Sequence, residues 1–185
     1  MTRLLVALVL TASFLLPAAS KAADEADISK VMTDYWAAYA KADYGAAAKL
    51  ILPEDLALAQ KEMPPVFIEA ARSSSSEAKE MAAAFFGPIP PDQRASLTGI
   101  QTYECLNRFI GVAMPGLLET LKASTITVDK VEIRAAEATA FYKVSIQGET
   151  SESTEAFIKK DGKWWLRVKE DPKETARKFR ALLAQ

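Results

Sequence analysis

The chain has 185 residues, half of them hydrophobic, with 23 basic and 24 acidic residues and a net charge of −1. It has no histidine and one cysteine, Cys105. This balance gives no electrostatic basis for binding nucleic acid. The lack of histidine excludes Ser-His and Cys-His catalytic pairs and histidine-containing zinc sites, so we expect no metal and no cofactor. The length is that of one domain. Cys105 has no partner for a disulfide within the chain, and we expect it to be buried.

Residues 1–22 are typical of a secretory signal peptide. Arg3 precedes an apolar run over residues 4–16, and Ser20-Lys21-Ala22 fits the small-x-small cleavage pattern. A retained membrane anchor is the less favoured alternative, because the run is shorter than the roughly 20 residues of a spanning helix. Cleavage would remove Arg3 and Lys21 and leave 21 basic against 24 acidic residues, a net charge of −3. We expect a periplasmic or secreted protein that does not associate with a membrane after cleavage.

Helical patterns dominate the chain before residue 122. Apolar and aromatic residues recur at helical spacing over residues 27–42 and predict an amphipathic helix. Asp43 is expected to cap a second helix over residues 44–52, and Pro53 to start a third that runs towards Lys61. Pro64-Pro65 is expected to break this third helix before a separate helical segment at residues 66–71.

Capping signals predict the helices that follow. Ser74-x-x-Glu77 precedes a periodic run to Phe86, and Thr98-x-x-Gln101 precedes a segment that continues to Ile110. Another short helix is expected over residues 115–121. Asp171-Pro172-x-Glu174 predicts a final helix.

Alternating residues predict four consecutive antiparallel strands. The first spans residues 124–134 with a bulge near Asp129-Lys130, because the parity of its apolar residues changes there. The second spans residues 137–147 and has a plain inward face. That face carries Ala138, Ala140, Tyr142, Val144 and Ile146.

Two registers compete for the last hairpin, which turns at Asp161-Gly162. A two-residue loop pairs Ala156 with Arg167, whereas a three-residue loop pairs Phe157 with Trp165. We favour the second, because it gathers apolar residues on one face. That face would hold Ala156, Ile158, Trp164, Leu166 and Val168. The opposite, outer face would then present Phe141, Phe157 and Trp165 as an apolar patch for a homodimer.

Three features in this order resemble the NTF2-like (cystatin-like α+β) superfamily. They are the long aromatic helix, the segment Ala40-Lys41-Ala42-Asp43-Tyr44-Gly45-Ala46-Ala47, and Lys160-Asp161-Gly162-Lys163-Trp164-Trp165 at the end of the sheet. The helix that begins Pro115-Gly116-Leu117-Leu118 and leads into the sheet resembles that of exported bacterial members of this superfamily without assigned activity. The resemblance implies a single domain over residues 23–185, with a helical insertion at about 56–121. Its α+β fold would pack N-terminal helices on a curved four-stranded antiparallel sheet, followed by a C-terminal helix, around an inner pocket.

Such a pocket favours a non-catalytic binding or interaction module. The candidate ligand-binding residues are Tyr35, Trp36, Tyr39, Phe85, Tyr142 and Trp164. Together they would line a cavity for an apolar small molecule, either lipid-like or aromatic. The competing interpretation is that these side chains simply fill a close-packed core.

The alternative function is a metal-independent proton-transfer enzyme of the isomerase or dehydratase type. Without histidine, acid–base chemistry falls to carboxylates and phenols. The candidates are Asp34, Tyr35, Tyr39, Asp55, Tyr103, Glu104 and Tyr142, none of which we assign as catalytic. Asp34 lies off the apolar stripe and is expected to be solvated. Ser76-x-x-Lys79 matches an acyl-enzyme motif but lacks the companion motifs, and the serine run is explained as a helix cap.

Overall fold

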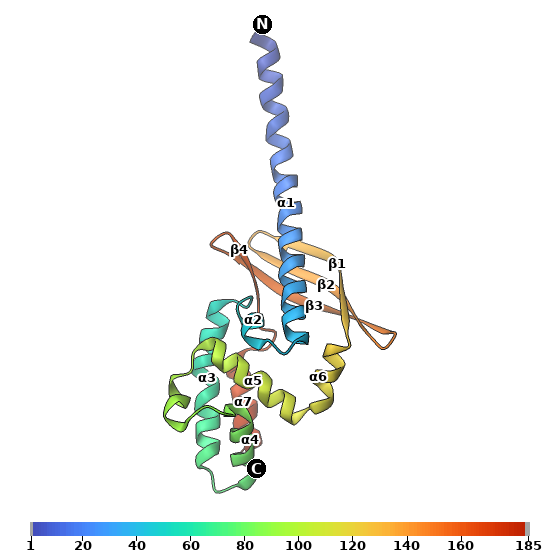
Figure 1. Ribbon diagram of the computed structural model, residues 1–185. Helices are drawn as coiled ribbons and strands as arrows, with labels where there is room; N and C mark the ends of the chain where they lie inside the picture. Colours follow the sequence, from blue (N-terminus) through green and yellow to red (C-terminus); the bar gives the residue numbers. More distant parts are fainter. Residues whose placement is uncertain (1, 184–185) are drawn as a thin grey trace.

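The chain folds as helices, then a sheet, then one more helix. In the computed structural model, which describes the backbone of residues 2–183 and the side chains of residues 20–183, the α+β class is confirmed (Figure 1). The helices are α1 (Thr2–Ala40), α2 (Tyr44–Ala48), α3 (Pro53–Arg72), α4 (Ser76–Phe86), the 3-10 helix η1 (Pro91–Ser96), α5 (Gly99–Ala113), α6 (Pro115–Lys122) and α7 (Pro172–Leu183). The strands are β1 (Thr125–Arg134), β2 (Glu137–Ile146), β3 (Glu149–Lys160) and β4 (Lys163–Leu166).

Helix α1 covers residues 27–40 of the predicted helix and extends it towards the N-terminus, whereas Lys41 and Ala42 lie in the turn that follows. Figure 1 shows its N-terminal part projecting beyond the sheet. Side chains up to residue 19 lie outside the described residues, so the signal peptide stays a prediction. Among the described residues, no helix is long and apolar enough to cross a membrane. Residues 20–23 are exposed, and Asp24 accepts hydrogen bonds from Lys159 Nζ (2.5 Å) and Trp164 Nε1 (2.9 Å).

The four strands form one antiparallel sheet in the order β1-β2-β3-β4, as predicted. The bulge is confirmed, because the β1–β2 register shifts between Val128 and Lys130. Ala138, Ala140 and Tyr142 are buried, which confirms the inward face of β2. Helix α1 covers this face, where Ile28 and Met32 are fully buried.

The predicted register of the last hairpin is wrong. Phe157 pairs with Leu166 and Lys160 with Lys163, so the loop has two residues, Asp161 (φ 52°) and Gly162 (φ 76°). Positive φ at both loop positions defines a type I′ turn, whose twist matches that of the strands. The change of register turns Phe157 into the core, where it is 2% exposed. Phe157 is therefore not part of an outer interface, and Ile158 lies opposite Trp165 instead.

Helix α3 continues through Pro64-Pro65, so the predicted break is also wrong. Proline has no N–H and deprives the carbonyl four residues earlier of its partner. Those carbonyls belong to Gln60 and Lys61, which are exposed and can be hydrated, while Phe67 beyond the prolines is fully buried. Packing therefore outweighs the two lost hydrogen bonds.

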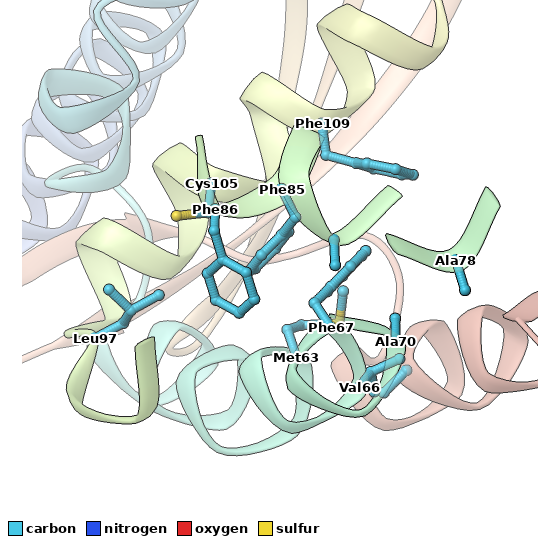
Figure 2. Close-up of a cluster of buried hydrophobic side chains, with 12 residues drawn as sticks. Met63, Val66, Phe67, Ala70, Ala78, Phe85, Phe86, Leu97, Cys105 and Phe109 are labelled. Carbon is cyan, nitrogen blue, oxygen red and sulfur yellow. The ribbon is translucent and has the colours of Figure 1, made fainter. Parts of the chain in front are cut away.

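Helices α3, α4, α5 and α7 enclose a first hydrophobic cluster, the helical core (Figure 2). At its centre Phe67 stacks on Phe85, with ring centroids 4.0 Å apart, and tilts against Phe109 at 5.3 Å. Cys105 is buried there, as predicted. The other buried members are Met63, Val66, Ala70, Ala78, Ala82, Phe86, Leu97 and Ala176.

Capping residues set the ends of these helices. The capping box of Thr98 and Gln101 on α5 is confirmed. The N-cap of α4 is Ser75, one residue after the predicted Ser74, and its side chain accepts from Ala78 N. Asp43 caps α2 as predicted, through Ala46 N, although α2 ends earlier than expected.

A second cluster, the sheet core, lies between α1 and the sheet. Its buried members are Ile28, Met32, Ala48, Ile51, Leu56, Ala138, Ala140, Tyr142, Phe157, Trp164 and Leu166. The segment between α2 and α3 is hydrogen-bonded to the end of β4 through the backbone. Leu166 N donates to Leu50 O (3.0 Å), and Leu52 N donates to Leu166 O (2.9 Å).

Candidate functional site

A cavity of about 450 Å³ lies where the helical core meets the sheet core. The helical core contributes Met63, Leu106, Ile110 and Phe179 to its walls, and the sheet core contributes Tyr35, Trp36, Ile51, Leu56, Tyr103, Leu166 and Val168. Its volume lies within the range of small-molecule sites, which is about 300–1,000 Å³. The walls are predominantly apolar, so the polar groups that remain determine its chemistry.

All five tyrosines of the chain gather at or beside this cavity. Tyr35, Tyr39 and Tyr103 line it. Tyr142 donates to Glu155 Oε1 (3.2 Å), and Glu155 also lines the cavity. Tyr44 packs edge-on against Tyr39, with ring centroids 5.3 Å apart. One side of the cavity is therefore rich in phenols.

Two pairs of residues with i, i+4 spacing hold the phenols together. Tyr35 and Tyr39 lie one turn apart on α1, and Tyr103 and Asn107 lie one turn apart on α5, so each pair shares a helix face. The Tyr35 and Tyr103 hydroxyls form a hydrogen bond of 2.7 Å. Tyr39 donates to Asn107 Oδ1 (2.5 Å), and Asn107 Nδ2 donates to the Tyr103 carbonyl (2.9 Å), which orients the amide.

The phenols remain protonated at neutral pH. Burial raises the pKa of Tyr35 well above its ordinary value and also raises the pKa of Tyr39 and of Tyr103. Ionisation would place a charge in a poorly hydrated environment. These hydroxyls therefore serve as hydrogen-bonding groups rather than as bases.

Glu155 is the acidic group at this wall. It pairs with Ala140 across the β2–β3 ladder, which places it on the same side of the sheet as the buried core residues. Burial raises the pKa of the Glu155 carboxyl, and Lys169 and the hydrogen bond from Tyr142 oppose that shift. Glu155 and Tyr142 therefore place a carboxyl and a phenol next to each other at this wall.

Asp55 has a structural role at the edge of the cavity. Its Oδ2 accepts from Arg167 Nε (2.8 Å) and from Val168 N (2.9 Å). The hydrogen bond to Asp55 raises the pKa of the Arg167 guanidinium. Because Arg167, Val168 and Lys169 line the cavity, this contact holds the segment after β4 in place as part of the wall.

The predicted ligand-binding residues separate into two groups. Tyr35, Trp36 and Tyr39 line the cavity, and Tyr142 reaches it through Glu155. The other two lie outside it. Phe85 is fully buried in the helical core, and Trp164 is buried in the sheet core.

Several wall residues were not among the predicted ligand-binding set. Asn107 and Leu106 on α5, and Phe179 on α7, line the cavity. The i, i+4 spacing of Tyr103 and Asn107, matching that of Tyr35 and Tyr39, is the sequence signal for part of this wall. Nothing in the sequence signals that α7 closes the cavity, because that contact depends on tertiary packing.

The predicted outer patch does not form as a cluster. Phe141 and Trp165 are half-buried on the face opposite the core, whereas Phe157 is on the core side. Each outer ring is covered by a lysine. Lys163 Nζ lies 3.7 Å from the Trp165 ring centroid, and Lys130 Nζ lies 5.7 Å from that of Phe141.

Other candidate groups are accounted for by local contacts. Asp34 is exposed and pairs with Lys30 (2.6 Å), which confirms that it is solvated. Ser76 and Lys79 are both exposed on α4. Among the side chains that the structure describes, no three acidic or cysteine residues come together as a metal site. No protein-family model, curated protein or solved structure matches this chain.

Proposed function

We propose that the protein is a non-catalytic binding module for an apolar small molecule, which occupies the cavity between the two cores. The observation that carries this proposal is the cavity itself, with its volume of about 450 Å³ and its predominantly apolar lining. Walls of this kind with a few placed polar groups are typical of ligand sites. The predicted signal peptide and the NTF2-like resemblance agree with an exported protein of this type.

Most polar groups at the cavity already have partners within the protein. Asn107 accepts from Tyr39, Glu155 accepts from Tyr142, and Asp55 accepts from Arg167. A ligand therefore gains mainly from apolar contact, at roughly 25 cal/mol per Å² of buried area before the costs of association.

The test is to fill the cavity from one wall. Leu106 on α5 lines the cavity, whereas Val112 on the same helix is 62% exposed and does not. We expect the wild type and Val112→Trp to bind N-phenyl-1-naphthylamine with one site, and Leu106→Trp to lose at least tenfold in affinity. Fluorescence titration measures this, and melting curves establish that both variants fold. Equal affinity of a folded Leu106→Trp variant would contradict the proposal.

A second candidate function is metal-independent proton transfer, which the raised pKa of Glu155 beside Tyr142 favours. Such a carboxyl can take a proton from the carbon next to a ligand carbonyl and return it. The measurement is deuterium exchange into a bound aryl methyl ketone, followed by NMR. Exchange faster than in buffer that disappears in Glu155→Gln would support catalysis. Exchange at the buffer rate would contradict catalysis and support binding without proton transfer.

A further inference from the structure

The Tyr35–Tyr103 pair carries one more hydrogen-bond proton than its described partners accept. Each phenol has one proton to donate. Their mutual hydrogen bond of 2.7 Å uses one proton, whichever residue donates. Within residues 20–183 the other proton has no acceptor, whereas Tyr39 donates to Asn107 and Tyr142 donates to Glu155.

This remaining proton lies in an apolar setting. Tyr35 and Tyr103 both line the cavity and both belong to the partly buried shell of the sheet core. A buried donor without an acceptor costs more than a typical hydrogen bond contributes. A ligand atom that accepts this proton would therefore add both affinity and orientation.

We propose that the ligand is an uncharged apolar molecule with a hydrogen-bond-accepting oxygen, such as a ketone carbonyl, which accepts the second proton of the Tyr35–Tyr103 pair. This inference rests on the binding function proposed above. An ammonium group has no lone pair with which to accept a phenolic proton. A carboxylate would share the cavity with Glu155. Of the two basic residues that line the cavity, Arg167 is already paired with Asp55 and Lys169 is exposed to solvent.

The test compares two ligands of the same shape, 2-acetonaphthone and 2-isopropenylnaphthalene, in which a methylene group replaces the carbonyl oxygen. The quantity measured is the ratio of their affinities, from competition with a fluorescent probe. In the double variant Tyr35→Phe/Tyr103→Phe we expect the affinity of the ketone relative to that of the hydrocarbon to fall about tenfold. This is the effect of losing one hydrogen bond. Each single variant keeps one phenol proton and should keep most of the preference.

The matched control is Tyr44→Phe. It also removes one phenol proton, but Tyr44 packs against Tyr39 and does not line the cavity. We expect the ketone-to-hydrocarbon ratio of this variant to equal that of the wild type. A second readout is the carbonyl stretch of bound 2-acetonaphthone, which should lie at lower wavenumber in the wild type than in hydrocarbon solvent.

The outcomes separate the two proposals. An unchanged ratio in the double variant, or an unshifted carbonyl stretch in the wild type, would overturn this inference while the cavity still bound both ligands. Tighter binding of 2-naphthoate than of the ketone would overturn the uncharged class. Failure of the wild type to bind any of the three would overturn the binding function itself.

Discussion

The helical core and the sheet core are built from different kinds of side chain. In the helical core Phe67 and Phe85 stack face to face, fully buried, among other apolar groups. In the sheet core, two of the three buried aromatic side chains carry polar atoms that have partners: Trp164 donates to Asp24, and Tyr142 donates to Glu155, whereas Phe157 is apolar. The first arrangement provides stability and the second provides directional contacts. The cavity lies between the helical core and the sheet core.

The largest effect is expected from truncation in the helical core. Phe67→Ala should lower the free energy of unfolding by about 3–5 kcal/mol, because it removes a fully buried ring and leaves a cavity. Tyr35→Phe, at the cavity, removes only one hydroxyl and should lower the free energy of unfolding by about 1 kcal/mol or less. Urea denaturation measures both. Similar costs for the two substitutions would contradict the division of roles between the cores.

A smaller loss is expected where the start of α3 binds the segment after β4. Asp55→Ala removes the acceptor of Arg167 Nε and Val168 N and should cost about 1.5–3 kcal/mol, as for hydrogen bonds to a buried charge. Glu54→Ala is the control, because Glu54 is exposed on the same helix and pairs with Lys160 at the surface. Its cost should be below about 1 kcal/mol. Equal unfolding midpoints for the two variants would show that the contacts of Asp55 with Arg167 and Val168 do not stabilise the fold.

The smallest effect, of opposite sign, concerns Glu155. Its pKa is raised in the folded protein by burial, so the unfolded chain loses this proton first as the pH rises. Stability is then full below the unfolded pKa of about 4.3 and falls as the pH rises towards the folded pKa. Glu155→Gln should therefore melt higher than the wild type at pH 7 and equal to it near pH 3.5. A variant that is less stable at pH 7 would show that the charged carboxylate is favoured by its surroundings.

Local rules predicted much of the framework. Periodicity gave all four strands and the bulge of β1, and short-range capping gave the Thr98–Gln101 box. The failures occurred where packing decides. Pro64-Pro65 stays helical because buried neighbours hold α3, and the two-residue turn at Asp161-Gly162 is selected together with the burial of Phe157.

The candidate site was predictable only in part. The stripe of Tyr35, Trp36 and Tyr39 follows from helical spacing and does line the cavity. Phe85 and Trp164 were predicted to bind the ligand because they are aromatic, but both are buried within the two cores. The sequence identifies the aromatic residues, but it does not show which of them surround a cavity. The position of the cavity depends on how α5 and α7 pack.

The hydrogen bonds of Asp24 set an order of assembly. They join residue 24 to residues 159 and 164, across 135 and 140 positions of the chain. Contacts of such long sequence separation form slowly, because bringing distant residues together costs the entropy of closing a long loop. In a chain that emerges N-terminus first, α1 has no β4 to dock on until nearly the whole sequence is available. The cavity, with Leu166 and Phe179 in its walls, can close only after that step.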